Sequence, residues 1–186
     1  MKLLGIDPGN KRMGLASLHM TPGGIALGEC EVIYHNNDNN LSFNVYLNEG
    51  IANLCEAFPW ILHQTQPDVI VAEIIPVGRL GSNTELNVAA ITVCKVIAWQ
   101  WGIDWIDIAA NTVKKTITGD GRATKAKIKH TVVKEFPSLV GRNEDIKKQQ
   151  KMEGVKAEGF PQDLYDAVAV GWAGLLIHGD KKTKED

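Results

Sequence analysis

Leu3-Leu4-Gly5-Ile6-Asp7-Pro8-Gly9, close to the start of the chain, is a short apolar run that ends in an acid and a turn. The apolar residues predict a buried strand, and Pro8-Gly9 predicts that the strand stops there. A carboxylate at the end of a buried strand is costly to keep charged without a partner. Asp7 is therefore the first candidate for a residue that binds a cation.

Three further acids occupy comparable positions. Glu73 ends a second apolar run, residues 69–72. Asp163 and Asp166 lie three residues apart at the start of an apolar, helix-like segment, and on a helix this spacing puts both on one face. Simpler explanations exist for each: a turn former, a surface acid and a pair of helix-capping residues. Together, these simpler explanations leave two acids at strand ends without a role.

Hydrophobic periodicity and turn signals predict the order three strands, helix, strand, helix, strand and two helices. Strands are expected at residues 3–7, 13–18, 28–34, 69–74 and 103–108. Helices are expected at residues 42–64, 82–100, 124–137 and 163–178, with Pro59 kinking or splitting the first. The polar stretch 141–159 is expected to be an exposed insertion or mobile loop.

This order predicts an α/β fold in which a mixed β-sheet carries helices on both faces. The strands that start at residues 3 and 69 become parallel neighbours if a right-handed crossover through the first long helix joins them. Asp7 and Glu73 would then lie at the same end of adjacent strands, ~5 Å apart in backbone spacing. The sequence therefore predicts one site built from acids of distant segments.

Length and composition predict a single domain, residues 1–186, with an ordinary apolar fraction of 44% and charged fraction of 23%. Lys2 is followed by too short an apolar run for a signal peptide, and no stretch is long enough to span a membrane. Three scattered cysteines predict buried thiols in a reducing compartment. A cytoplasmic protein is expected.

Positive charge is concentrated between residues 114 and 134, although the formal net charge of the chain is −2. This segment holds Lys114, Lys115, Arg122, Lys125, Lys127, Lys129 and Lys134, and its one acid is Asp120. A solvated helix face and a surface that binds a polyanion both explain such a run, and charge alone does not separate them.

A cluster of four carboxylates suits phosphodiester hydrolysis. This reaction needs an activated water, a neutralised phosphate and a stabilised leaving oxyanion, and a pair of divalent ions supplies all three. Mg²⁺ and Mn²⁺ favour oxygen ligands, so three or four acids suffice to hold the pair. The acids therefore predict a metal-dependent nuclease centre.

Four segments follow one another in an informative order. They are residues 4–9 with Gly14, residues 71–73, residues 113–125 and residues 162–167. In this order they resemble the motifs of the RuvC family of Holliday-junction resolvases, within the ribonuclease H-like superfamily. The first segment alone is weakly specific, whereas the ordered set is strongly specific.

The resemblance implies a homodimer that uses Mg²⁺, with Mn²⁺ as a substitute and two ions per active site, to make paired nicks across a four-way DNA junction. It implies four catalytic metal ligands: Asp7, Glu73, Asp163 and Asp166. It places Lys114 and Lys125 at the DNA backbone or scissile phosphate, where positive charge stabilises the transition state. The basic segment adds Lys115, Arg122 and Lys127 as DNA-binding residues.

Two features depart from the family. The family tends to carry an aromatic residue soon after the second acid, which stacks on bases, whereas this chain has Ile74-Ile75-Pro76 and then Arg79. The guanidinium plane of Arg79 can take the stacking role on DNA. The stretch 141–159 stands just before the catalytic helix, within reach of DNA or a partner. Both departures concern substrate specificity and suit a divergent member from a virus or phage.

Three alternatives remain open. Another ribonuclease H-like nuclease, acting on RNA, an RNA–DNA hybrid or generic branched DNA, would share the acidic centre. An ATPase domain of the actin and sugar-kinase type also begins with a strand that ends in Asp, but it needs a second lobe and a second Gly-rich loop. A DNA-binding protein that does not cut would not need all four acids.

Overall fold

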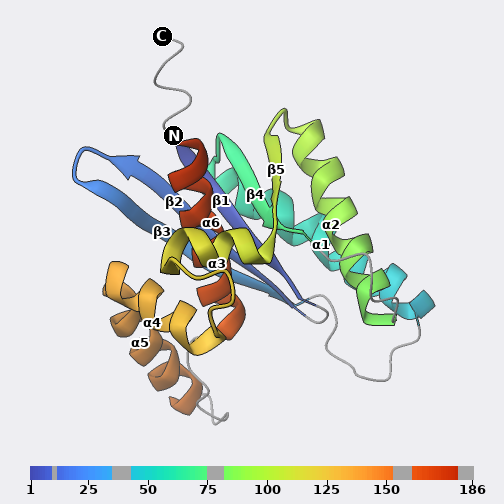
Figure 1. The fold of residues 1–186 in the computed structure, drawn as a ribbon. Helices are drawn as coiled ribbons and strands as arrows, with labels where there is room; N and C mark the ends of the chain where they lie inside the picture. The colour runs from blue at the N-terminus through green and yellow to red at the C-terminus, as the bar shows by residue number, and fades with distance from the viewer. Residues whose placement is uncertain (10–11, 35–42, 75–81, 153–160, 180–186) are drawn as a thin grey trace.

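The computed structural model describes residues 1–9, 12–34, 43–74, 82–152 and 161–179. Within these residues, one mixed sheet has the strand order β3-β2-β1-β4-β5 (Figure 1). Its strands are β1 (Lys2–Pro8), β2 (Arg12–Thr21), β3 (Gly24–Tyr34), β4 (Val69–Glu73) and β5 (Asp104–Ile108). The first three pair antiparallel, and β1, β4 and β5 pair parallel.

Helices cover both faces of the sheet. They are α1 (Phe43–Thr65), α2 (Ser82–Gln100), α3 (Ala110–Thr118), α4 (Lys125–Glu135), α5 (Ser138–Met152) and α6 (Gln162–His178). One buried cluster joins the sheet to α6, α3 and α4, and a second joins the opposite face to α1 and α2. Figure 1 shows α6 lying across the middle of the sheet, with α3 beside it.

The alternation of side chains along the two central strands decides which face each acid occupies. Leu3 on β1 packs in the cluster with α6, whereas Leu4 packs with α1 and α2. Residues two apart on a strand share a face, so Asp7 lies on the α6 side. Val71 on β4 also packs with α6, two residues before Glu73. Both acids therefore face the helix that carries the other two.

Helix α6 packs directly onto β1 and β2 because two glycines leave room for it. A Cβ atom on Gly5 would lie 2.7 Å from Cα of Gly171 and would overlap the carbonyl oxygen of Ala167. A Cβ atom on Gly14 would overlap the carbonyl oxygen of Asp163. The first turn of α6 is thereby held against the β1–β2 hairpin, at the end of the sheet where Asp7 lies.

The predicted α/β architecture is confirmed. All five expected strands and all four expected helices are present, and β1 pairs parallel with β4 from Leu3↔Val69 to Ile6↔Ala72. No helix among the described residues is long and apolar enough to cross a bilayer. The expectation of three buried thiols is wrong, because Cys55 is exposed, one residue past the buried Leu54 on α1.

Pro59 does not split the first long helix. It lies inside one continuous helix, Phe43–Thr65. The neighbouring Phe58 and Leu62 are 0% and 1% exposed. Their burial against the sheet outweighs the one backbone hydrogen bond that a proline removes.

The expectation of a loop over residues 141–159 is wrong for residues 141–152, which belong to α5, while residues 153–159 lie outside the described residues. Helix α5 is hard to predict because its contact with the core is sparse: Leu139 is buried and Ile146 is partly buried. A side-chain hydrogen bond adds to this contact, since Arg142 Nη1 donates to the Gly28 carbonyl oxygen on β3 at 2.7 Å.

Helix α3 has no counterpart in the predicted order. It is nine residues long, and its N-cap residue, Ala109, offers no side-chain hydrogen bond. Its buried residues are Val113 and Ile117, which lie one helical turn apart. Two apolar positions are too few to show a helical period in the sequence. Such a short helix depends on its tertiary contacts with α6 and α4 more than on local sequence signals.

Alanine at position 14 should destabilise the fold, because its methyl group would overlap the Asp163 carbonyl oxygen on α6. We expect Gly14→Ala to lower the free energy of unfolding by about 1–3 kcal/mol in a urea titration. The control is Gly23→Ala, where the added Cβ would meet Thr21 Oγ1 at an ordinary contact distance of 3.8 Å. The control should stay within about 0.5 kcal/mol of wild type. A Gly14→Ala protein as stable as this control would contradict the close packing of α6.

Candidate active site

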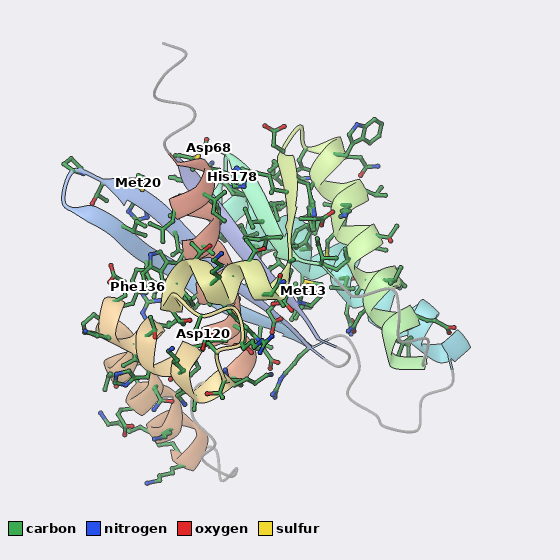
Figure 2. All side chains as sticks on the ribbon, viewed as in Figure 1. Met13, Met20, Asp68, Asp120, Phe136 and His178 are labelled. Atoms are coloured by element: carbon green, nitrogen blue, oxygen red, sulfur yellow. The ribbon has the colours of Figure 1, made fainter. Side chains whose placement is uncertain are left out.

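Four carboxylates from three distant segments meet at one end of the sheet. Asp7 lies near the end of β1, Glu73 ends β4, and Asp163 and Asp166 lie in the first two turns of α6. The label of Met13, which pairs with the residue after Asp7, marks this end of the sheet in Figure 2. The charges of Glu73, Asp163 and Asp166 each raise the pKa of Asp7, so the three lie near enough to act on it.

Burial and like charge shift the pKa of both strand acids upward. Burial is the largest cause for Asp7, whose pKa is raised well above its usual range, and the charges of the other acids add to it. The pKa of Glu73 is also raised, first by burial and then by Asp166, while Lys114 and Lys125 lower it. Such a cluster favours binding of a proton or a cation, because either one reduces the repulsion.

Side chains of the protein already pair with the two acids of α6. Lys125 Nζ lies 3.4 Å from Asp166 Oδ2, and Arg12 Nε donates to Asp163 Oδ2. Gln162 Nε2 donates to Asp166 Oδ1 at 3.0 Å. The pKa of Lys125 is raised, chiefly by the charge of Asp166. These contacts orient both carboxylates.

The two lysines that were predicted to be catalytic both lie beside the acids. Lys114 is half-buried on α3, and its charge acts on Glu73. Thr124 caps α4 as predicted, accepting a hydrogen bond from the backbone N–H of Lys127 at 3.3 Å. The cap makes Lys125 the first residue of α4 and places it next to Asp166.

The other predicted DNA-binding residues lie on the surface that adjoins the acids. Lys115 and Arg122 line a surface hollow between α3 and the turn before α4. Lys127 Nζ lies 3.7 Å from Asp120 Oδ2, and the latter side chain also accepts a hydrogen bond from the backbone of Arg122. Asp120 is labelled in Figure 2 near α4. Arg79 lies outside the described residues.

The donor set of the cluster suits a hard divalent cation. All four acids offer carboxylate oxygens, which Mg²⁺ and Mn²⁺ prefer, and burial together with like charge raises the pKa of Asp7 and of Glu73. Among the described residues, no three or more Asp, Glu, His or Cys side chains are already arranged so that they could hold a metal ion together. Asp163 and Asp166 are paired with side-chain cations instead, so an ion must displace or share these contacts.

Sequence reasoning missed Arg12 and Gln162. Arg12 begins β2, and the hairpin pairing that joins β1 to β2 returns it to the acidic end of the sheet. Gln162 lies four residues before Asp166, a spacing at which two side chains interact on a helix. This contact could therefore have been predicted from the sequence. The capping explanation for Asp163 is wrong, because the N-cap residue of α6 is Pro161.

Removing the charge of Asp7 should stabilise the protein when divalent ions are chelated. Because the pKa of Asp7 is raised on folding, stability is lost as the pH rises from about 4 through that raised pKa. We expect Asp7→Asn to raise the melting temperature at pH 8 in EDTA by roughly 2–4 °C, equivalent to about 1 kcal/mol. The gain should vanish below about pH 3, where the carboxyl is protonated in both the folded and the unfolded state.

The matched control is Asp145→Asn on α5, whose carboxylate is exposed and pairs with Lys148 at the surface. This control should show no gain at pH 8. Equal melting temperatures for Asp7→Asn and wild type at pH 8 would contradict the proposed repulsion.

Known proteins resemble the chain in sequence and in fold. The crossover junction endodeoxyribonuclease RuvC of Lawsonia intracellularis is 28% identical over 178 residues, which cover 95% of this chain and 91% of that protein. The RuvC of Cereibacter sphaeroides is 28% identical over 142 residues, 75% of this chain and 79% of that protein.

Among solved structures, T. thermophilus RuvC in complex with a Holliday junction substrate has a TM-score of 0.72 at 19% identity, and the match covers 97% of this chain and 96% of that one. At this identity the likeness shows the shared ribonuclease H-like fold. The family model described as crossover junction endodeoxyribonuclease RuvC matches residues 3–172, a span that includes the four acids and both lysines. The chain therefore belongs to the RuvC family.

Proposed function

We propose that this protein is a metal-dependent endonuclease that resolves four-way DNA junctions by hydrolysing phosphodiester bonds. The observation that carries the proposal is the meeting of four carboxylates at one end of the sheet, with Lys114 and Lys125 beside them. Membership of a family whose named relatives are crossover junction endodeoxyribonucleases supports the same reaction and substrate.

In this proposal Asp7, Glu73, Asp163 and Asp166 hold Mg²⁺, with Mn²⁺ as a substitute and two ions per site. When bound, the ions supply an activated water and neutralise charge on the scissile phosphate. The protein contributes a backbone framework that brings the four acids to one end of the sheet. Gly14 supports this role, because it lets the α6 backbone at Asp163 pack against β2.

The two lysines place positive charge where the reacting phosphate develops negative charge. Lys125 pairs with Asp166 in the free protein, and its side chain is 74% exposed, so it is free to turn toward a phosphate oxygen. Lys114, on α3, is near enough to Glu73 for its charge to lower the pKa of that acid. Fixed cations at these positions stabilise the transition state more than the ground state.

We further propose that DNA runs from the acids along α3 and the start of α4. The exposed cations Lys115, Arg122 and Lys127 follow that route. Contacts between cations and phosphates give affinity and orientation but no base sequence preference. Arg79, which follows the second acid in the sequence, remains our candidate for stacking on bases at the junction.

Paired cuts require two active sites, so we propose that the protein acts as a homodimer. Helix α2 offers a surface for a second copy. Val88, Val96 and Trp99 are 46%, 49% and 80% exposed on it, and their spacing puts them on one side of the helix. An apolar stripe of this kind is stabilised when a partner covers it.

A cleavage assay tests the function. The substrates are a synthetic four-way junction, a linear duplex of the same sequence and an RNA–DNA hybrid, each with Mg²⁺ and with EDTA. We expect symmetrical paired nicks in the junction, only with Mg²⁺. Asp7→Asn and Glu73→Gln should each slow cutting by about 100-fold or more while junction binding is retained.

The control variant is Glu144→Gln, which changes an exposed acid on α5 and should cut at the wild-type rate. Cutting of the RNA–DNA hybrid would indicate that the protein acts as another kind of ribonuclease H-like nuclease. A wild-type rate for Asp7→Asn would show that the site is assigned wrongly.

Neutralising the lysines separates catalysis from binding. Lys125→Gln and Lys114→Gln should each slow cutting by about tenfold or more, because each removes positive charge near the reacting phosphate. A variant that loses a phosphate contact should also lower the slope of log affinity against log salt by about one unit. Lys148→Gln on α5, where the lysine pairs with Asp145, serves as control. If both variants kept the wild-type cutting rate and the wild-type salt slope, these lysines would be solvated surface residues without a role in cutting or binding.

A further inference from the structure

Strand β3 and helix α1 form a groove away from the acidic cluster. Strand β3 is last in the sheet order, so no strand of the described residues pairs with its outer side. A hollow of about 560 Å³ lies between β3 and α1, and a second of about 160 Å³ adjoins it. Glu31, Trp60 and Ile61 line both hollows, which therefore form one continuous groove.

The strand that borders the groove is open to pairing. An edge strand presents a row of N–H and C=O groups on its outer side, and proteins often protect such a row with lysine or proline. The groove half of β3, residues 29–34, reads Glu-Cys-Glu-Val-Ile-Tyr and contains neither. Arg142 contacts the strand at the Gly28 carbonyl oxygen, before this segment, and at the Cys30 thiol at 3.7 Å, a side-chain contact on the α6 side of the strand.

An aromatic side chain lies at the groove with much of its surface uncovered. Trp60 on α1 is 56% exposed, whereas the adjacent Ile61 is 4% exposed and forms part of the core beneath. A half-covered indole next to a rigid apolar floor is a suitable anchor for an apolar side chain of a ligand.

The charge of the groove is negative. Glu29, Glu31 and Glu56 line it, and among the described residues that line it there is no lysine or arginine. Burial and the charge of Glu29 raise the pKa of Glu31, so a cation nearby would relieve this carboxylate. A phosphate backbone would be repelled here, and two copies of the groove would repel each other. Charge therefore disfavours DNA as the occupant, and it disfavours pairing of this groove with the same groove of a second copy.

We propose that this groove binds an extended basic segment of another protein, which adds a strand to the outer side of β3 and packs an apolar side chain on Trp60. Glu29 and Glu31 are two apart and share one side of the strand, so the partner carries lysine or arginine at alternate positions. Backbone pairing supplies affinity, and the alternate side chains supply specificity.

The position of the groove leaves the acidic cluster open to DNA. Ile33 and Ile61, which line the groove, pack in the buried cluster with α1 and α2, on the sheet face opposite α6. The exposed cations Lys115 and Arg122 lie on and next to α3, on the α6 side. A partner bound at β3 therefore does not compete with a substrate for the same surface.

A display library of random octapeptides, screened against the full chain, tests the proposal. We expect enriched peptides with lysine or arginine at alternate positions and no internal proline. For a synthetic copy of one such peptide, Trp60→Ala and Glu31→Lys should each weaken binding by about tenfold in fluorescence anisotropy. Amide hydrogen exchange of residues 29–33 should slow when the peptide is bound. Cutting of a four-way junction by Trp60→Ala should be unchanged.

Matched controls are Trp101→Ala, an exposed tryptophan just after α2, and Glu144→Lys, an exposed glutamate on α5. Both should bind the peptide as wild type does. Glu56→Lys, on the exposed side of α1, replaces Glu31→Lys if that variant fails to fold.

Four results would overturn the proposal. They are recovery of no basic peptides, equal losses in the control variants, equal binding of a peptide with proline at its centre, and slowed exchange on an element other than β3. A wild-type dimer in sedimentation that Trp60→Ala or Glu31→Lys dissociates would also overturn it, because the occupant would then be a second copy.

Discussion

The close contact of α6 with β1 and β2 forces four carboxylates into one small region. Gly14 makes room for the α6 backbone at Asp163, and Gly5 does the same one turn further along. Burial raises the pKa values of Asp7 and Glu73, and repulsion from the neighbouring acids raises them further. The fold therefore brings these carboxylates together although their charges repel. Packing across the whole sheet stabilises an arrangement that the acids alone would not adopt.

Side-chain cations offset part of the negative charge of the four acids. Arg12 pairs with Asp163, and Lys125 pairs with Asp166. A divalent ion that binds the acids must compete with these ammonium and guanidinium groups. The same cations then become available for phosphate oxygens, so the groups that pair with the acids can also supply charge for a substrate.

Much of the fold follows from local sequence signals, because the strands are strongly apolar and the turns are marked by Pro and Gly. The failures have physical causes of one kind. Pro59 stays inside α1 because Phe58 and Leu62 are buried beside it. Helices α3 and α5 are not predicted from the sequence because each presents few apolar residues to the core. In all three helices, tertiary contacts override the local preference of the chain.

The sequence by itself was enough to predict that Asp7 and Glu73 lie together, since each is a carboxylate at the end of an apolar strand. It also predicted that the basic segment with Lys114 and Lys125 accompanies them. Only the tertiary structure decided that Arg12 pairs with Asp163, and that β3 and α1 enclose an acidic groove beside Trp60. Local signals extend over a few residues, whereas these contacts join segments whose distance in space depends on the packing of the whole sheet.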